Sequence, residues 1–415
     1  MRARRAAAVA GLGDVAHPDA GEEVWRYSRI DELDLESYLP SSQRPTGASL
    51  GASLGDSPGD SLGAGAAATV VLCDGWIQSV QVSEAATEAG VLVGTVADLE
   101  GGPEILGAVL EAPVDLFGHL NRAFCPEPLA VLVPDGIRLD GPVVIVSHVA
   151  TEGVAAFPRL LVRCGIDAEA TVVEVQTSDD VGAMVTPVLE AIVGRAGRLR
   201  HAVLQELGQR VWQMAHQEVH VGQEASVELF HAGLGGDYAR TRTDCRLLGR
   251  GAGCHITAAY FGDGSQALDY RTFLDHAAPD TVSELLFKGA VDDASRSVYS
   301  GLIRVRPEAV RTRANQTNRN IKLSPDAWAE SVPNLEIETD DVMCSHASTV
   351  SPVDADQRFY LESRGVPTDV AERLLLEGFF AEVVEAAPVP AVGNRLHSGL
   401  RAKLDQHEAV GSDAA

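Results

Sequence analysis

Polar turns recur at a nearly constant interval through a strand-rich stretch of the chain, and this period constrains the fold more than any other feature. The turns begin at Asp167, Arg195, Gly222 and Arg250, so successive turns lie 28, 27 and 28 residues apart. A period of roughly 20 to 50 residues is typical of stacked repeats, in which one coil cannot bury its apolar face without its neighbours. The interval therefore predicts a β-solenoid.

The residues between these turns favour short strands. Apolar runs such as LAVLVP, PVVIVSHV, TVVEVQ and SVELFHA follow one another without the helical segments that a sheet of alternating strands and helices requires. The period alone does not exclude a β-sandwich. We predict a parallel solenoid over residues 131–350, whose end strands have unpaired edges that must be covered or paired with another chain. A partner chain is therefore expected.

The segment before this core is expected to be less regular. We predict a disordered tail and a short helical cap over residues 1–40, a flexible linker over residues 41–68 and a small α/β entry module over residues 69–130. The linker is rich in Gly, Ala and Ser, which is typical of a tolerated loop insertion. Packed structure should therefore resume after this linker.

A helical pattern follows the core. Asp354 and Gln357 form a capping-box arrangement and Gly365 provides a stop, so we predict a helical domain over residues 351–390 and a disordered tail over residues 391–415. The second helix of this domain carries apolar residues on more than one face, which suits either packing between the helices or docking of a partner. The candidate partner-binding residues are Leu375, Phe379, Phe380 and Val383.

Composition excludes several classes of function. The chain has 33 basic and 59 acidic residues, a formal charge of -26, which argues against binding to nucleic acid or to an anionic membrane surface. No apolar run approaches the roughly 20 residues of a membrane span, and the first residues make a poor leader peptide. Six cysteines without a C-x-x-C pair favour free thiols in a reducing compartment. We therefore expect a cytoplasmic protein.

Cys344 and His346 are the leading candidates for a chemical site. They lie in an expected strand, Val342–Ala347, where alternate residues share a face, so both side chains should project together. Thiolate and imidazole are ligands that hold iron or accept sulfur. From the residues alone, a buried apolar thiol beside a hydrogen-bonded imidazole is the alternative.

Other motifs carry weaker signals. His216, Glu218 and His220 would share one face of a strand and suggest zinc, but the order differs from HExxH. Val219 and Val221 would point inward, which favours a solvated outer surface for the three polar residues. Cys245 and Cys254 suit either sulfur carriage or, preferably, buried packing. No phosphate-binding G-K-[ST] motif is present, so the chain is not expected to hydrolyse ATP.

Four further motifs are distinctive: NQTN (315–318), PNLE (333–336), DDVMCSH (340–346) and FYLESRG (359–365). Together they resemble the C-terminal third of SufD, one of the paired SufB/SufD scaffold proteins of the Suf iron-sulfur cluster assembly system. The SufB branch carries an acidic residue after the histidine and a cysteine near Thr317, whereas this chain has Ala347 after His346 and an Asn-rich run at Thr317. The SufD branch is therefore the better match.

The resemblance implies a mainly β fold, a right-handed parallel β-helix with helical regions at its N-terminal and C-terminal ends. It also implies a non-catalytic scaffold that pairs with a SufB-like chain, or with itself, and docks a SufC-like ABC-type ATPase through the C-terminal helices. His346 would help to hold a transient iron-sulfur cluster at the partner interface, with Cys344 in a less defined role, and reduced flavin is a further candidate cofactor of the complex.

Two alternative functions remain open at this stage. A SufB-type sulfur-accepting scaffold is the nearer one. A solenoid alone would also suit a carbohydrate-active β-helix enzyme, with Asp292 and Asp293 as acid and base. Such enzymes are usually rich in groove aromatics, whereas aromatic residues make up 5% of this chain. The composition therefore favours a scaffold.

Overall fold

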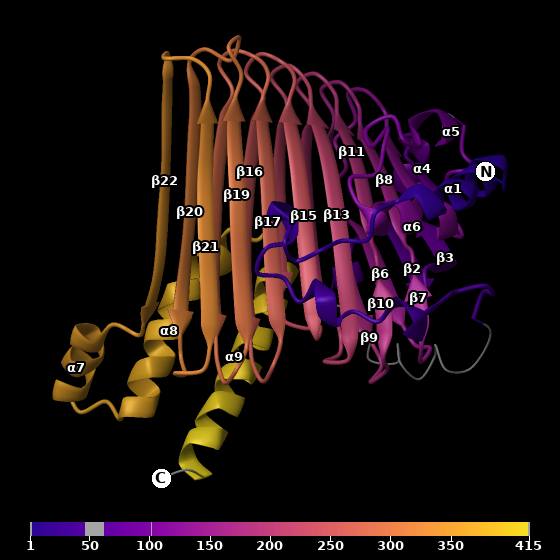
Figure 1. Cartoon of the computed structure of the whole chain (residues 1–415). Helices are drawn as coiled ribbons and strands as arrows, with labels where there is room; N and C mark the ends of the chain where they lie inside the picture. Colours follow the sequence, from indigo (N-terminus) through magenta and orange to yellow (C-terminus); the bar gives the residue numbers. More distant parts are fainter. Residues whose placement is uncertain (1, 46–61, 101, 414–415) are drawn as a thin grey trace.

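The computed structural model describes residues 2–45, 62–100 and 102–413. Its centre is a parallel β-solenoid of about eight turns, with helices before and after it in the chain (Figure 1). The predicted fold class, a mainly β parallel β-helix with helical regions at both ends, is confirmed. Most of the linker predicted over residues 41–68 lies outside the described residues.

Two sheets form the walls of the solenoid. Sheet A has 12 strands and sheet B has 10, and consecutive strands of the solenoid alternate between the sheets. Along its main path, sheet A contains β4 (Leu92–Thr95), β5 (Leu129–Val133), β8 (Arg159–Cys164), β11 (Val188–Val193), β13 (Val211–Val221), β15 (Tyr238–Leu247), β17 (Ala267–His276), β19 (Arg296–Val305) and β21 (Trp328–Ile337), with β1 (Leu39–Pro40), β7 (Val154–Ala156) and β10 (Ala183–Val185) beside it.

Sheet B forms the other wall of the solenoid, and its strands follow one another along the same axis as those of sheet A. Its strands are β3 (Trp76–Val82), β2 (Ala68–Cys73), β6 (Val143–Val149), β9 (Glu169–Ser178), β12 (Arg198–Glu206), β14 (Ser226–Gly233), β16 (Gly253–Gly262), β18 (Val282–Val291), β20 (Thr312–Lys322) and β22 (Val342–Pro352). From β6 to β22 each strand pairs in parallel with the next strand of the same sheet.

The polar turns found in the sequence are the corners of successive coils. Each contains a residue with a left-handed backbone: Asp167 at φ 52°, Ala196 at 57°, Glu224 at 55° and Gly251 at 72°. Such a conformation lets the chain change direction sharply between strands. Between the walls lies a core of Val, Leu, Ile and Ala side chains that is contiguous through most of the coils. The period therefore reflects one corner per coil.

The first residues form a helix, which corrects the predicted disordered tail. α1 (Arg2–Gly11) is fixed by two arginines: Arg4 Nη1 donates to the carbonyl of Leu106 at 2.6 Å, and Arg5 donates to the carbonyl of Pro126. The entry module contributes three more helices. They are α4 (Glu84–Glu88), α5 (Gly102–Ile105) and α6 (Leu116–Phe124), the last capped by Asp115.

The N-terminal segment then crosses the outer face of sheet A (Figure 1). The helical cap predicted here consists of short 3₁₀ helices. Trp25 and Ile30 are buried there among Met214, Trp212 and Tyr238 of sheet A. The 3₁₀ helices are η1 (Leu12–Asp14), η2 (Glu23–Trp25), η3 (Ile30–Glu32) and η4 (Leu35–Ser37).

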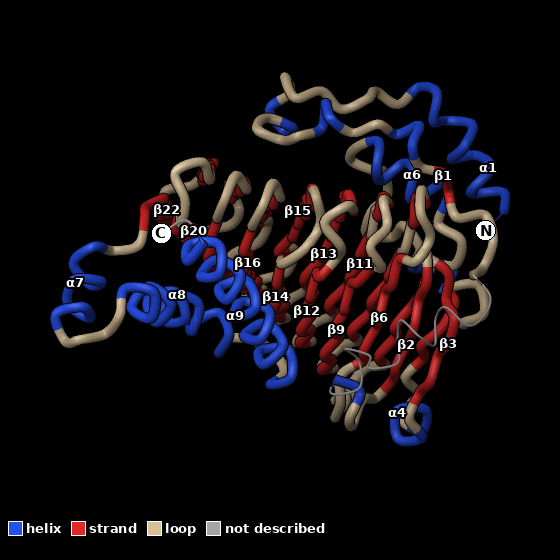
Figure 2. Tube along the Cα trace, turned by 90° about the horizontal axis from the view of Figure 1, so that it is seen from below, coloured by secondary structure: helices blue, strands red, loops and turns tan. Residues whose placement is uncertain are grey.

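Three helices follow the solenoid, and two of them cover the outer face of sheet B (Figure 2). α7 (Ala355–Ser363) begins at the predicted cap, where Asp354 Oδ1 accepts from the backbone N–H groups of Asp356 and Gln357, both at 3.0 Å. α8 (Thr368–Glu385) follows. Within the described residues, none of the helices combines the length and hydropathy required of a membrane span.

The expected disordered tail after residue 390 is wrong, because α9 (Pro390–Asp413) occupies it. Apolar residues four positions apart form a stripe on this helix that is buried against sheet B and α8. Lys403 Nζ contacts Asp263 Oδ1 at 2.9 Å and so ties the helix to the turn after β16. The stripe consists of Val392, Leu396, Leu400 and Leu404.

Candidate functional site

β22 is the last strand of sheet B, and its outer edge has no strand beside it among the described residues. It pairs with β20 on one side, and β21 likewise ends sheet A beside β19 (Figure 1). An uncovered edge carries backbone N–H and C=O groups that can pair with another chain. The predicted bare end of the solenoid is therefore present at its C-terminal end.

Cys344 and His346 lie on this edge strand. Val342 and Cys344 are half-buried against the solenoid core, whereas Met343 between them is 73% exposed, so the strand alternates as the sequence indicated. His346 is two positions beyond Cys344, in the next position of the alternation, and is exposed. Of the six cysteines, all free, Cys344 is the one that is not buried. The arrangement presents sulfur and imidazole nitrogen at an open edge.

The Cys344 thiol is not activated by its surroundings in the isolated chain. Burial raises its pKa, and a backbone hydrogen bond involving Ala314 only partly opposes the shift. The thiolate is the form that binds metal or attacks sulfur. Cys344 therefore needs a cation or another positive group beside it before it can act as a ligand.

Gln316 is a further candidate site residue, which the sequence reasoning missed. It faces His346 in register on β20, and the two strands stand about 4.8 Å apart, as neighbouring strands do. Gln316 is 1% exposed, and neither its amide nitrogen nor its amide oxygen has a hydrogen-bond partner among the described residues. Gly301 of β19 makes room for it, because a Cβ there would lie 2.5 Å from Gln316 Nε2.

Two more buried amides of β20, those of Asn318 and Asn320, form a hydrogen-bonded group with Tyr260. Asn318 Nδ2 donates to the Tyr260 hydroxyl at 3.0 Å, and that hydroxyl donates to Asn320 Oδ1 at 2.8 Å. Asn320 Nδ2 donates in turn to Asn318 Oδ1 at 2.8 Å. The NQTNRN segment thus supplies three buried amides, of which only that of Gln316 is unpaired. The signal available in the sequence was the NQTN motif itself.

The His216, Glu218 and His220 motif lies where predicted but is not solvated. Val219 and Val221 face the core, so the three polar residues face outward from sheet A. His216 is nevertheless 5% and Glu218 3% exposed, which corrects the expected solvated surface. Segments distant in sequence cause this burial.

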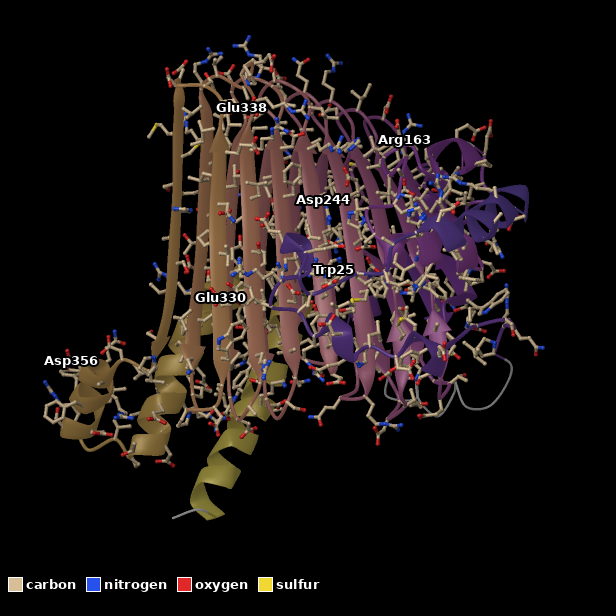
Figure 3. All side chains as sticks on the ribbon, in the orientation of Figure 1. Trp25, Arg163, Asp244, Glu330, Glu338 and Asp356 are labelled. Atoms are coloured by element: carbon tan, nitrogen blue, oxygen red, sulfur yellow. The ribbon has the colours of Figure 1, made fainter. Side chains whose placement is uncertain are left out.

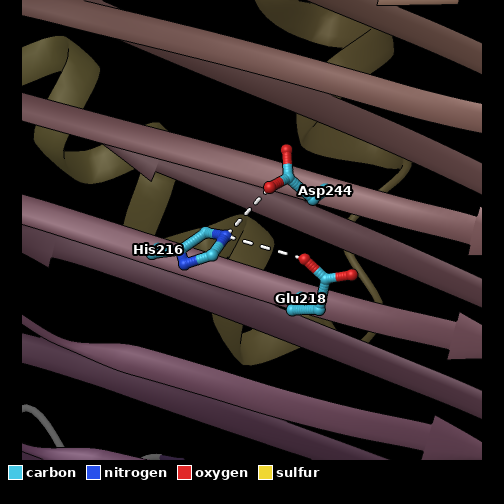
Figure 4. Close-up of side chains that lie close together, drawn as sticks. All are labelled: His216, Glu218 and Asp244. Carbon is cyan, nitrogen blue, oxygen red and sulfur yellow. Dashed lines mark hydrogen bonds and ion pairs between the residues drawn. The ribbon is translucent and has the colours of Figure 1, made fainter. Parts of the chain in front are cut away.

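Two hydrogen bonds hold those covering segments on sheet A. Arg240 Nη2 donates to the carbonyl of Val24 at 2.7 Å, and Glu190 accepts from the N–H of Leu110 at 3.0 Å. Trp25 and Asp244 lie on this side of the molecule (Figure 3), and Asp244 contacts His216 (Figure 4). The sequence alone cannot indicate that such distant segments pack on neighbouring strands of sheet A.

The remaining candidate residues have structural surroundings. Cys245 and Cys254 are fully buried, and hydrogen bonding between them together with burial raises the pKa of Cys245 well above its ordinary value. Asp293 lies in a turn at φ 48° and accepts from the N–H of Gly264, and Asp292 is 4% exposed. The two thiols suit packing, and the two carboxylates support a corner of the solenoid.

On α8, the candidate partner-binding residues divide into two groups. Phe380 and Val383 are buried against sheet B and α9, while Leu375 and Phe379 are half-buried. Lys288 fixes the helix, since its Nζ donates to the carbonyl of Phe379 at 2.8 Å and contacts Glu382 at 2.7 Å. The exposed large apolar residues of α7 and α8 are Phe359, Tyr360, Val370 and Leu374.

Comparison with known proteins identifies the core of the chain. Residues 147–379 match the family model described as "SUF system FeS cluster assembly, SufBD core domain". An iron-sulfur cluster assembly SufBD family protein of Mycobacterium tuberculosis is 34% identical over 288 residues, which cover 68% of this chain and 70% of the relative. The iron-sulfur cluster assembly protein SufD of Escherichia coli is 30% identical over 335 residues, 77% of each chain. The chloroplastic protein ABCI7 of Arabidopsis thaliana is 28% identical over 339 residues, covering 77% of this chain and 70% of that protein.

Proposed function

Because the chain belongs to the SufB/SufD family of iron-sulfur cluster assembly proteins, we propose that it is a SufD-type, non-catalytic scaffold subunit that pairs with a SufB-like chain. The observation that carries this proposal is the presence of Cys344 and His346 on an edge strand that, in the described part of the chain, has no strand beside it on one side. Ligands at such an edge leave coordination positions for a second chain.

The SufD role is supported by both the relatives and the local sequence. SufD of Escherichia coli is similar to this chain over most of both proteins. Ala347 stands after His346, and no cysteine lies near Thr317, as expected of the SufD branch. The six free thiols suit a reducing compartment, so we propose that the protein works in the cytoplasm.

The nascent cluster is the cargo in this proposal. His346 offers a neutral imidazole nitrogen to iron from the edge of β22, and a cysteine of the SufB-like chain completes the site across the interface. Cys344 contributes a thiolate once iron lies close enough to lower its pKa. Gln316, buried beside His346, positions the imidazole or the incoming cluster sulfide through its unpaired amide.

We further propose that a SufC-like ATPase docks on α7 and α8. Phe359 and Tyr360 of α7 are 71% and 58% exposed, and Leu374 of α8 is 47% exposed, so the helix pair offers apolar area to a partner. β22 ends at Pro352 and α7 begins at Ala355. A pull on the helix pair would therefore reach the strand that carries His346 through only a short connection.

Anaerobic co-expression with a SufB-like chain and a SufC-like ATPase tests the proposal. Iron and acid-labile sulfide are measured in the purified complex and in a His346→Ala variant. We expect the variant to assemble into the complex but to contain several-fold less iron and sulfide. His255→Ala is the matched control, because the His255 side chain is 47% exposed and its Nδ1 lies 3.7 Å from Glu284 Oε2, a partner that is exposed as well. An unchanged cluster content in His346→Ala would contradict the assignment.

A further inference from the structure

A second group of metal-ligand residues lies on the outer face of sheet A, away from β22. His216, Glu218 and His220 come from β13 and Asp244 from β15, the next strand of the sheet. We call these four residues the His216 cluster. One ligand atom from each of His216, Glu218 and Asp244 lies within 4.8 Å of the others, and all three residues are buried. A set of imidazole and carboxylate ligands on one rigid sheet is thus already assembled.

Distances within the cluster suit a small cation. His216 Nε2 lies 3.0 Å from Asp244 Oδ2 and 3.8 Å from Glu218 Oε2 (Figure 4). Two ligand atoms that each stand about 2.1 Å from a tetrahedral ion are roughly 3.4 Å apart. The observed separations lie on either side of this value, so small side-chain rotations would admit an ion between the three groups.

His220 supports the cluster from outside by holding the Glu218 carboxylate. Its Nε2 lies 3.2 Å from Glu218 Oε1, on the opposite side of the same carboxylate. His216 interacts through Nε2 alone, since its Nδ1 is buried without a hydrogen-bond partner among the described residues. Glu218 thus stands between two imidazoles, each of which turns a ring nitrogen towards it.

Two arginines neutralise the carboxylates when no ion is bound. Arg242 Nε lies 2.9 Å from Asp244 Oδ2, and Arg246 Nε lies 3.3 Å from Glu218 Oε1. The Arg242 side chain is 26% and the Arg246 side chain 45% exposed. Either guanidinium can turn to water and leave its carboxylate to a cation, because the bound ion would supply the positive charge that the buried carboxylate requires.

The cluster is least covered on its His220 side. The His220 side chain is 21% exposed and stands beside Arg246 at the edge of the buried group. An ion arriving there meets His220 and Glu218 first and then His216 and Asp244. His220 is thus the member of the cluster most accessible to a soluble ion.

We propose that the His216 cluster binds one divalent transition-metal ion of the zinc and cobalt class, independently of the cluster-assembly site on β22. Imidazole together with carboxylate favours such borderline ions over Mg²⁺, which prefers oxygen ligands and retains its water. The ion would join β13 to β15 beneath the N-terminal segment. It is separate from the proposed scaffold function and does not depend on it.

Cobalt titration of the full-length chain, stripped with chelator, tests this inference. We expect one equivalent of Co²⁺ to bind with visible d–d absorption and without the near-ultraviolet charge-transfer band of cobalt–thiolate bonds. Zn²⁺ should displace it and excess Mg²⁺ should not. His216→Ala and Asp244→Asn should each weaken binding at least tenfold, and the partly exposed His220→Gln should weaken it less.

Two comparisons keep the test decisive. His346→Ala should leave Co²⁺ binding unchanged, which separates this site from the one on β22. Since variants of buried residues can misfold, each is compared with wild type by thermal unfolding, and His220→Gln alone must still weaken binding. Absence of saturable binding by the wild-type chain, a thiolate band, or equal affinity in His220→Gln and wild type would each overturn the proposal.

Discussion

Gln316 and His346 occupy the same position on neighbouring parallel strands at the open end of the solenoid. Gln316 is buried with both polar amide atoms unpaired among the described residues, whereas His346 is exposed. A buried unpaired polar group reduces stability by about 1–3 kcal/mol. Retention of such a group beside a candidate ligand is the pattern expected of a residue that serves the site rather than the fold.

Replacement of this amide should therefore separate stability from function. We expect Gln316→Leu to leave the free energy of unfolding unchanged or higher by about 1 kcal/mol, since a buried unpaired amide is removed. Iron and sulfide content of the co-expressed complex should fall several-fold. Urea unfolding and metal analysis of the same preparation measure the two effects.

Gln217→Leu is the matched control, because Gln217 is a buried glutamine in the middle of the solenoid that accepts from Thr243 Oγ1 at 3.3 Å. It should lower stability by about 1 kcal/mol through the lost hydrogen bond and leave cluster content intact. If Gln316→Leu behaved in the same way as this control, the positioning role of Gln316 would be wrong.

The solenoid was predictable from the sequence because every coil must turn at the same place. Asp167 and Ala196 illustrate the signal, since polar or small residues in a left-handed conformation mark the corners at a constant interval. The placement of Cys344 and His346 at alternate positions of one strand was predictable for a similar reason: strand alternation is a local rule. These local patterns were therefore enough to predict the solenoid core and the edge strand.

The features that sequence reasoning missed depend on contacts between distant segments. The α9 segment from Val392 to Leu404 has Gly, His, Ser and Arg between its apolar residues, so its mean hydropathy is low. The helix becomes recognisable only when sheet B is present to bury its apolar stripe. The burial of His216 depends on residues near Val24 and Leu110. Gln316 was missed because inward and outward residues of NQTNRN are all polar, and hydropathy cannot distinguish them.

The free edge of β22 leads to a prediction about assembly. Met343→Lys places a charge on the exposed face of this edge strand, where Met343 is 73% exposed, and lysine on an edge opposes strand pairing. We expect at least a tenfold loss of affinity for the SufB-like chain, measured by sedimentation, with an unchanged melting temperature.

Leu248→Lys provides the control for that charge change. Leu248 is also an exposed apolar residue, at 49%, but it follows β15 in a turn remote from β22. It should not affect pairing. Equal binding by the Met343→Lys chain and the wild-type chain would show that partners meet elsewhere.

The C-terminal helix leads to a prediction about stability. Leu396→Ala removes a fully buried side chain between α9 and sheet B, and such truncations lower the free energy of unfolding by about 2–5 kcal/mol. Leu374→Ala on the exposed side of α8 should change it by less than about 0.5 kcal/mol. Chemical unfolding compares the two, and a similar small effect in both would mean that α9 does not pack on sheet B.

His276 leads to a prediction about acid stability. The ring is fully buried at the end of β17, with Nδ1 bonded to Thr281 at 2.8 Å and Nε2 to Ser283 at 2.9 Å, and burial lowers its pKa to about 4. Unfolded histidine titrates near 6.5. Above that pH the ring is neutral in both states, so its contribution to stability is complete there.

As the pH falls from about 6.5 to about 4, the unfolded chain takes up a proton that the folded chain resists, and this group lowers stability by about 3 kcal/mol. His276→Gln removes that titration. Urea unfolding between pH 7.5 and 4 should therefore show a shallower loss of stability in His276→Gln than in wild type, whereas His255→Gln, a change at an exposed histidine, should follow wild type. His231, whose pKa burial lowers to about 3, contributes the same slope to all three proteins and cancels in the comparison. Parallel profiles for His276→Gln and wild type would mean that the ring at 276 is protonated equally readily in the folded and unfolded chain.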